Sequence, residues 1–326
     1  MPLMNTPFAP GECLKAVESM EEGAQRNIAW AEYFYFSGQP EKAIGKAQPY
    51  LASDDAGARL SACLICSYAH LHFSQDDKAL AGLTQIERAL HDMVDGSPQA
   101  QAESAFVAAA ASILLHLPLP QGMPNMEEML PLLPQGLRAF ALYLRAHSLY
   151  LEKQYGLSAG IAEAALTMGG NRFPIPAIYL HLVAVMDYMS LKDRDHAHDH
   201  LMRAWALARP DDLIEGFGEH HGLLGGMLES AIKPAWPAEF KRIIEITYRF
   251  SAGWRRVHNP VTGEEVADNL TTTEFASAML AARGWTNQEI ADHLGVSINT
   301  AKRHLSHAME KLGVGSRKGL ERYMLR

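Results

Sequence analysis

Apolar residues recur every three or four positions along most of this 326-residue chain, which is the period of a helix that buries one of its faces. The period is regular at Ile290 and Leu294, and again in a longer series between Ala301 and Leu312. Before this part of the chain, helical runs are separated by short polar breaks. The pattern therefore predicts an all-α protein.

Four segments share a pattern of a helical run, a polar break and a second run that an alanine enters. The alanines are Ala43, Ala79, Ala159 and Ala197. The second and third lie about twice as far apart as the others, so one more unit fits between them, over 100–133. Prolines disturb the second helix of that unit. A small residue where two antiparallel helices approach is what a solenoid of helical hairpins requires.

The first of these units has further features of a known repeat. Gly38, Ala43 and Leu51 fall where the tetratricopeptide repeat has its turn glycine, its small residue and a late apolar residue. The period is also close to the ~34 residues of that repeat. Residues 1–252 therefore resemble a degenerate tetratricopeptide-like array, which implies a sensor or docking domain. Irregular packing of amphipathic helices is the alternative, because it would give a similar apolar pattern.

The segment RAWALARPDDLIEGFGEHHGLLGGML, over 203–228, carries a second resemblance. It is similar to the end of the helical region that precedes the DNA-binding domain in the MalT-like branch of LuxR-type regulators. Those regulators usually have an ATPase module with a GxxxxGK[ST] loop that cradles phosphates. No such loop occurs in this sequence, so ATP-driven assembly is not carried over.

The C-terminal part differs in charge from the rest. The formal net charge is -8, yet 270–326 holds eight lysine or arginine residues against five aspartate or glutamate residues. Opposite signs in two parts of a chain indicate two domains with different partners. Between them, 253–269 mixes proline, glycine and charged residues without an apolar period, and we predict a linker there. The C-terminal domain is expected to hold three helices and the start of a fourth.

Helix starts in this domain are marked by capping residues. Thr271 with Glu274, and Thr286 with Glu289, fit the capping box, in which a hydroxyl and a carboxylate satisfy backbone N–H groups reciprocally. Ser297 can cap a third helix. The turn LGVS before it is short, so the second and third helices must cross steeply, as in a helix-turn-helix. Opposite its buried face the third helix exposes, near its beginning, Asn299, Lys302, Arg303, Ser306 and His307.

Residues 270–326 resemble the LuxR/GerE-type helix-turn-helix domain. The resemblance rests on LTxxE at 270–274, GxTNxEIAxxLGVSxxTxKxH at 284–304 and KLGVxxR at 311–317. It implies a four-helix domain with a recognition helix over 297–312. The residues that align with groove-reading positions are Lys302, Arg303 and Ser306. Those that align with positions contacting or placing the DNA backbone are Ser297, Asn299, Thr300, His304 and Lys311.

Two residues depart from the family pattern. Ala301 and Ala308 stand where the family usually has larger aliphatic residues. Both fall on the buried face, so the core is expected to be smaller there unless Phe275, Met279 or Met309 fills the space. An unfilled cavity would reduce stability. Weak DNA binding by the isolated domain is therefore expected.

A ligand or partner at the repeats is expected to control the DNA-binding domain over 270–326, the reader domain. In the expected register, Tyr35, Phe36, Tyr68 and Tyr179 point into the concave face of the array, where they could bind a small molecule or a peptide. Packing within the core or against a partner helix explains these four residues as well.

Two clusters could in principle hold a metal, and neither is predicted to do so. Cys63 and Cys66 form a CxxC inside a helical run without a second ligand pair, so core packing is favoured. His196 and His200 share a helix face without an identifiable third ligand, and a solvated face is favoured. Because no nucleophile with its base is identified either, we expect no enzyme activity and no cofactor.

The location expected is the cytoplasm, without a membrane partner. The longest apolar run, over 105–117, is shorter than the ~20 residues that cross a bilayer. The first residues do not have the pattern of a secretory signal. The three cysteines are too few for a disulfide framework and suit a reducing compartment.

These features predict a bacterial, sequence-specific transcriptional regulator with its recognition helix in the major groove of DNA. The expected partners are double-stranded DNA, an unidentified small-molecule or protein effector at the repeats, a second copy of the chain on paired half-sites and, as a further candidate, RNA polymerase. The alternative is a protein-interaction adaptor or anti-regulator whose helix-turn-helix no longer binds DNA. The acidic body and the two alanines motivate that alternative.

Overall fold

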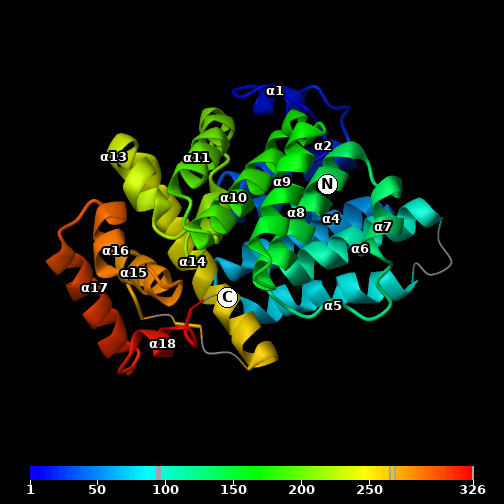
Figure 1. Ribbon diagram of the computed structural model, residues 1–326. Helices are drawn as coiled ribbons and strands as arrows, with labels where there is room; N and C mark the ends of the chain where they lie inside the picture. Colours follow the sequence, from blue (N-terminus) through cyan, green and yellow to red (C-terminus); the bar gives the residue numbers. More distant parts are fainter. Residues whose placement is uncertain (93–96, 264–265, 268, 325–326) are drawn as a thin grey trace.

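The structure is a computed structural model that describes residues 1–92, 97–263, 266–267 and 269–324. All regular structure within these residues is helical, which confirms the predicted fold class. Figure 1 shows most helices packed in one body, with a small group of C-terminal helices at one edge. No helix of the described residues is long and apolar enough to span a membrane.

Four pairs of consecutive helices in the body pack as hairpins, after a short α1 (Cys13–Glu18). Successive hairpins also touch, since α3 packs on α4 and α9 on α10. This is the arrangement of a helical solenoid. The pairs are α2 (Ala24–Phe36) with α3 (Pro40–Ala47), α4 (Ala56–Leu71) with α5 (Asp76–Asp92), α8 (Gln135–Leu151) with α9 (Tyr155–Thr167), and α10 (Pro174–Ser190) with α11 (Arg194–Ala208).

Each hairpin turns through one residue with a left-handed backbone. These residues are Gly38, Ser74, Lys153 and Lys192, with φ between 56° and 72°. After each of them, the next N–H bonds to the carbonyl five residues back, which closes the first helix. Only the first turn has the glycine that this conformation favours. The other three units therefore share the turn geometry of the first unit without sharing its residue.

The small residues predicted in the second helices are buried. Ala43, Ala79 and Ala197 each lie five positions after a turn residue and are at most 1% exposed. In the third unit this place belongs to Ser158, whose hydroxyl donates to a carbonyl of α8 at 2.7 Å. The sequence pattern put Ala159 at this position, which is one residue too late. The two places are hard to tell apart in the sequence, because the neighbours of Ala159 are small as well.

The unit predicted over 100–133 has only one long helix. That helix is α6 (Pro98–Ile113), and its end has a left-handed residue at His116. Only the short α7 (Met126–Met129) and a 3-10 turn at Leu130–Leu132 follow. The prolines of this segment lack the backbone N–H that a continuous helix needs, so the predicted disturbance is confirmed.

The predicted linker is wrong over 253–262. After the short α12 (Glu215–Glu219), a π-helical turn at Leu228–Ile232 and α13 (Lys233–Ala235), a single long helix, α14, runs from Pro237 to Thr262. Phe250, Trp254 and Val257 continue an apolar period through the segment and are buried. Glycine, proline and charged residues surround this apolar period and obscure it in the sequence. Gly263, with φ of 72°, ends the helix.

The C-terminal domain has the four predicted helices, α15 (Thr272–Ala282), α16 (Asn287–Leu294), α17 (Ile298–Lys311) and α18 (Arg317–Leu320). Both capping boxes are formed, and the Ser297 hydroxyl accepts the Thr300 N–H at 3.1 Å. α15 and α16 each pack on α17, and α15 also packs on α18. The helix starts were therefore predicted correctly from local hydrogen-bonding chemistry.

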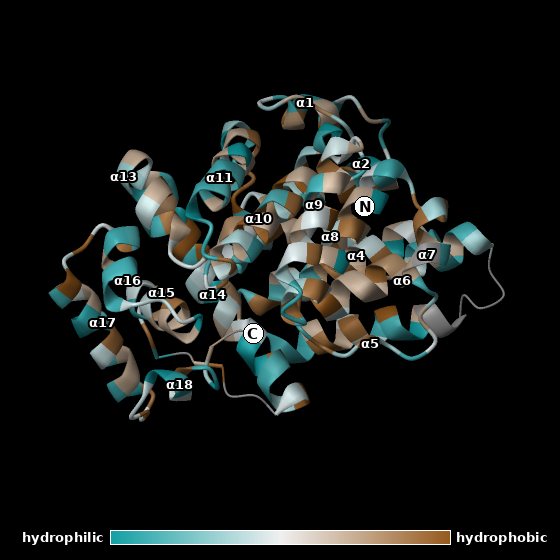
Figure 2. Ribbon diagram, in the orientation of Figure 1, coloured by the Kyte–Doolittle hydropathy of each residue, from teal (hydrophilic) through white to brown (hydrophobic). Residues whose placement is uncertain are grey.

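Hydrophobic residues fill the body. Figure 2 shows many of them on α4, α6 and α10, whereas α17 carries a mixture of hydrophobic and hydrophilic residues. α10 is buried along nearly its whole length, from Pro174 to Met189. Cys63 and Cys66 belong to the buried part of α4, which confirms core packing. Burial raises the pKa of the Cys66 thiol to about 12, so this thiol stays protonated and unreactive.

The C-terminal domain is docked on the body through backbone groups. Gly225 and Gly226 form a turn with φ of 60° and 80°, and the Gly225 carbonyl accepts a bond from His293 of α16 at 2.9 Å. A Cβ on Gly226 would lie 2.7 Å from the Leu294 side chain. From the body, Lys192 donates to the carbonyl of Gly284 at 2.9 Å. The contact is therefore close, and it needs glycine on the body side.

Arg283, the C-cap residue of α15, also bonds to the body across this contact. Its guanidinium donates to the Tyr150 hydroxyl and, at 2.9 Å, to the Leu223 carbonyl.

We expect Arg283→Met to lower the free energy of unfolding by about 1.5–3 kcal/mol, because bonds from a charged donor are lost. Urea denaturation measures the change. The exposed Arg303, changed to alanine, is the control and should cost no more than about 0.5 kcal/mol; equal losses would contradict the docking role.

Candidate nucleic-acid interface

The third helix of the C-terminal domain, α17, separates a buried face from an exposed one. Ala301, Leu305 and Ala308 are buried at a spacing of three or four residues. Figure 1 shows α17 at the outer edge of the molecule, on the side away from the helical hairpins. Its exposed face is therefore open to a large partner such as a duplex.

The residues predicted to read DNA lie on that exposed face or at its edge. Seven of the eight predicted contacts belong to the helix itself and the eighth, Ser297, is its N-cap. Lys302, Arg303 and Ser306 are exposed together. The residues predicted to contact the DNA backbone are exposed or half-buried. They are Ser297, Asn299, Thr300, His304 and Lys311.

Lys311 is occupied within the domain. Its ammonium group lies 2.6 Å from the carboxylate of Glu274, and His307 lies 3.8 Å from the same carboxylate. Burial alone would raise the pKa of Glu274, but the bonds from Lys311 and from Thr271 outweigh it and hold the pKa below its ordinary value. Glu274 thus ties the capping box of α15 to the end of α17. A phosphate at Lys311 would have to compete with this carboxylate.

His304 is half-buried on α17. Burial, and then the nearby Arg303 charge, lower the pKa of its imidazole. The ring is therefore neutral near pH 7, so it can donate or accept a hydrogen bond but supplies no charge to a phosphate. The positive charge of this face comes from Lys302 and Arg303.

The two alanines that depart from the family pattern are tightly enclosed. Ala301 is 1% exposed and Ala308 is 0% exposed. Met279 is buried in the same core, while Phe275 and Met309 are partly buried against it. The three larger residues expected to fill the space are thus buried or partly buried.

The four aromatic residues predicted to bind a ligand do come together. The ring centroids of Tyr35 and Tyr68 are 6.3 Å apart, and those of Phe36 and Tyr179 are 5.9 Å apart. None is on an open concave surface, since each is at most 6% exposed. Tyr35 and Tyr179 bond to Glu219, a residue that the sequence did not single out, and all four aromatic residues line with it a cavity of about 30 Å³. Their role in ligand binding stays a prediction.

The histidines of α11 divide between surface and interior. His196 is exposed and bonds to Asp193 at 2.7 Å, as a solvated face predicts. His200 is buried, and its Nδ1 lies 2.9 Å from that of His181 on α10. The solvated-face prediction is wrong for His200, because the helical period turns it inward. No group of three or more potential metal ligands is found within the part of the chain that the structure describes.

A family model described as bacterial regulatory proteins of the luxR family matches residues 268–324. The probable transcriptional regulatory protein SgaR of Hyphomicrobium methylovorum is 44% identical over 50 residues, which are 15% of this chain and 24% of SgaR. The oxygen regulatory protein NreC of Staphylococcus aureus is 40% identical over 57 residues, which are 18% of this chain and 26% of NreC.

These alignments span no more than 26% of either relative. No solved structure matches the chain. The family match covers the segment that holds α15 to α18, with both capping boxes and the exposed face of α17. Residues 268–324 therefore form a helix-turn-helix domain of the LuxR family.

Proposed function

We propose that this protein is a sequence-specific DNA-binding transcriptional regulator. The observation that carries the proposal is a LuxR-family helix-turn-helix domain whose third helix exposes Lys302 and Arg303 on the face opposite its buried stripe. A helix of this kind fits the major groove, where lysine and arginine donate to guanine acceptors. The names of the matched relatives, a transcriptional regulatory protein and an oxygen regulatory protein, support the same class of function.

In this proposal the exposed residues of α17 have two roles. Lys302, Arg303 and Ser306 face base edges, and the hydroxyls and amide at the start of the helix contact phosphates. Lys311 contacts the backbone only after it leaves Glu274. The acidic remainder of the chain suppresses non-specific attraction to DNA, so affinity depends on these few contacts.

The helical body is the controlling part in the proposal. It docks on the C-terminal domain through Arg283, His293 and the turn at Gly225, so a ligand or protein bound by the body can alter how the reader is presented. Two copies of the chain would bind paired half-sites, as helix-turn-helix proteins generally do. The assignment of 1–252 as sensor and 270–326 as reader belongs to this proposal.

The salt dependence of binding tests it. Genomic fragments that the full chain retains would supply a duplex, and fluorescence anisotropy would give its affinity at several salt concentrations. Log affinity should fall with log salt, with a slope of about -0.9 for each phosphate that a charged side chain of the subunit neutralises. A flat response, or no retained fragment, would reject DNA binding and favour a protein-interaction adaptor.

A further inference from the structure

A cavity of about 100 Å³ lies where the helical body meets the reader domain. The body contributes residues of α4, α8, α12 and α14 to its walls. The reader contributes Leu270, Thr272 and Phe275, at the start of α15. This cavity is therefore bounded by both of the parts that the proposed function couples.

A chain of hydrogen bonds links His116, a residue of the cavity wall, to His220, and the donors in it all point the same way along the chain. The Gly216 carbonyl can only accept, so Nδ1 of His220 donates to it at 2.7 Å and Nε2 of His220 accepts from the Tyr143 hydroxyl, also at 2.7 Å. The Tyr143 oxygen then accepts from Nδ1 of His147 at 3.2 Å. Finally, Nε2 of His147 accepts from Nε2 of His116 at 3.1 Å. The chain leaves Nδ1 of His116, a residue of the wall, as an acceptor.

These rings are neutral in the folded protein. Burial, followed by the neighbouring imidazoles, lowers the pKa of His116 to about 3 and that of His147 well below its usual value. Burial also lowers the pKa of His220 to about 4. The chain of bonds therefore keeps its direction at neutral pH, and the histidines bring no positive charge to the cavity.

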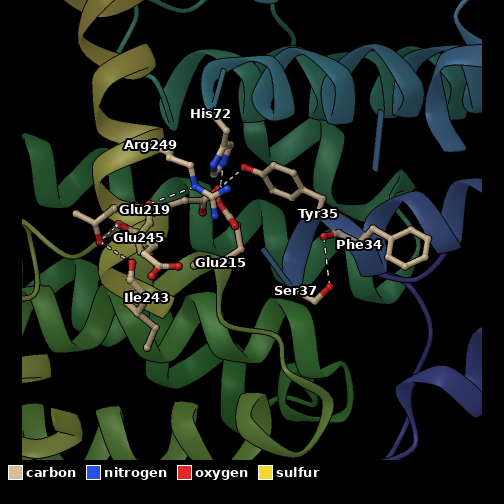
Figure 3. A network of polar contacts seen from close by, with 12 residues as sticks. Phe34, Tyr35, Ser37, His72, Glu215, Glu219, Ile243, Glu245 and Arg249 are labelled. Atoms are coloured by element: carbon tan, nitrogen blue, oxygen red, sulfur yellow. Dashed lines mark hydrogen bonds and ion pairs between the residues drawn. The ribbon is translucent and has the colours of Figure 1, made fainter. Parts of the chain in front are cut away.

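Glu219 brings negative charge to the same wall. It accepts hydrogen bonds from the Tyr35 hydroxyl and, at 2.6 Å, from the Tyr179 hydroxyl, one on each oxygen. Each carboxylate oxygen can accept a further bond. Figure 3 shows Tyr35 and His72 pointing toward the carboxyl groups of Glu215 and Glu219. His72 pairs with Glu215 at 2.9 Å, so one imidazole stands against two carboxyl groups.

Glu219 thus lies close to a second buried carboxyl group, that of Glu215. Burial, and then the Glu215 carboxylate, raise the pKa of Glu219 to about 7. Arg255 also lines the cavity, but it has an interaction of its own. A bound cation would stabilise the carboxylate form of Glu219.

Aromatic rings form another part of the wall. Tyr68 stacks on Phe250, with ring centroids 6.3 Å apart, and Trp254 stacks on His258 at 4.2 Å. The Tyr68 hydroxyl donates to two carbonyls of α6, so its oxygen could serve a ligand only as an acceptor. Aromatic faces attract cations and pack against apolar groups.

We propose that this cavity binds a small organic amine, as its ammonium ion, with its N–H groups on Glu219 and its apolar body against Tyr68, Phe250 and Trp254. Apart from Arg255, which has an interaction of its own, the polar groups described at the wall can accept a hydrogen bond, and an ammonium ion offers only donors. A carboxylate ligand would be repelled by Glu219. An alcohol would supply a single donor and leave the charge unpaired.

This cavity would be the effector site of the proposed regulator. The role of the amine as an effector of DNA binding therefore rests on the proposed function. An occupant would touch the start of α15 through Leu270, Thr272 and Phe275. It would therefore lie against both the helical body and the reader domain. Binding of the amine itself can be measured without DNA.

Isothermal titration calorimetry of the full chain with three probes tests the ligand class. The probes are phenethylamine, 2-phenylethanol and phenylacetate, which share an aromatic body and differ in the charge of the head group. We expect saturable binding of phenethylamine, weaker by at least about tenfold for the alcohol, because charge-assisted bonds are the stronger ones. Phenylacetate should bind least. Equal affinities, a preference for phenylacetate or no binding would overturn the proposal.

Two variants place the amine in the cavity. Glu219→Gln removes the charge at similar size and should weaken phenethylamine at least about tenfold. Ser251→Phe adds a ring at the wall and should abolish binding. Glu245→Gln, an exposed carboxylate on α14, is the matched control and should change nothing. Circular dichroism checks folding of each variant, and unchanged affinity in either folded cavity variant would reject the site.

The two proposals can fail separately. A failed titration with phenethylamine leaves DNA binding standing, since the duplex measurement contains no amine. Conversely, Lys302→Ala with Arg303→Ala should leave amine affinity unchanged, because both side chains are on the exposed face of α17.

Discussion

Changing Lys302 and Arg303 together to alanine is expected to weaken specific DNA binding by at least about thirtyfold, because each lost contact to a base is worth ~1–3 kcal/mol. Both side chains are exposed, and within the described part of the chain neither has a hydrogen bond or an ion pair. The fold should therefore be unaffected. Fluorescence anisotropy with a retained duplex measures the loss, at one fixed salt concentration.

The control for this experiment removes the same charge elsewhere. Lys42 and Lys46 are exposed on α3, in the helical body. Their double change to alanine should alter DNA affinity less than about threefold, since distant exposed charges are screened. Equal losses in the two double variants would show that net charge, and not α17, determines binding. Retained DNA binding but a lost protein complex would favour the adaptor.

Gly253→Ala is expected to destabilise the protein by more than about 3 kcal/mol, beyond the usual cost of overpacking. A Cβ at this position of α14 would lie 2.1 Å from the Leu71 carbonyl oxygen and 2.7 Å from the Leu71 Cα. The obstacle is backbone at the end of α4, which cannot rotate away as a side chain can. The helix crossing must therefore open, and the packing of Trp254 beside it is lost.

The same substitution at Gly160 should change the stability of the protein in the opposite direction. Gly160 lies on α9, is exposed, and has no atom within 4 Å of an added Cβ. Alanine there should stabilise the protein by ~0.4–1 kcal/mol, because glycine loses more backbone entropy in a helix. Urea denaturation of both variants gives the comparison. Gly253→Ala with wild-type stability would refute the close crossing.

The reader domain was the most predictable part of the structure. Its helix starts depend on hydroxyl and carboxylate groups within three residues of one another, as at Thr286 and Glu289. Such short-range bonds are visible in a single sequence. The buried face of α17 follows from its apolar period alone.

The linker error has a long-range cause. In the sequence Gly253 indicates irregular structure, yet it is where α14 crosses the end of α4. A glycine in a sequence can mark a turn or a close approach of two backbones, and only the partner helix decides which. That partner lies about 180 residues earlier, beyond the reach of local patterns.

The candidate ligand site was predictable only in part. The repeat pattern grouped Tyr35, Tyr68 and Tyr179, which do meet. It gave no sign of Glu219 or of the chain from His116 to His220, because these residues come from elements far apart in sequence. Their enclosure depends on α12 and α14, whose packing no repeat motif describes.

The length of α14 has a mechanical consequence. Its 26 residues form a rod of about 39 Å, which packs on α4, α5, α12 and α13 and lines the cavity along its middle. A tilt of about 5° would displace one end of such a rod by about 3 Å relative to the other. Paired recognition helices must match a spacing of ~34 Å along DNA. In the proposed dimer, a small occupant that tilts α14 would change the spacing of the two recognition helices relative to the grooves.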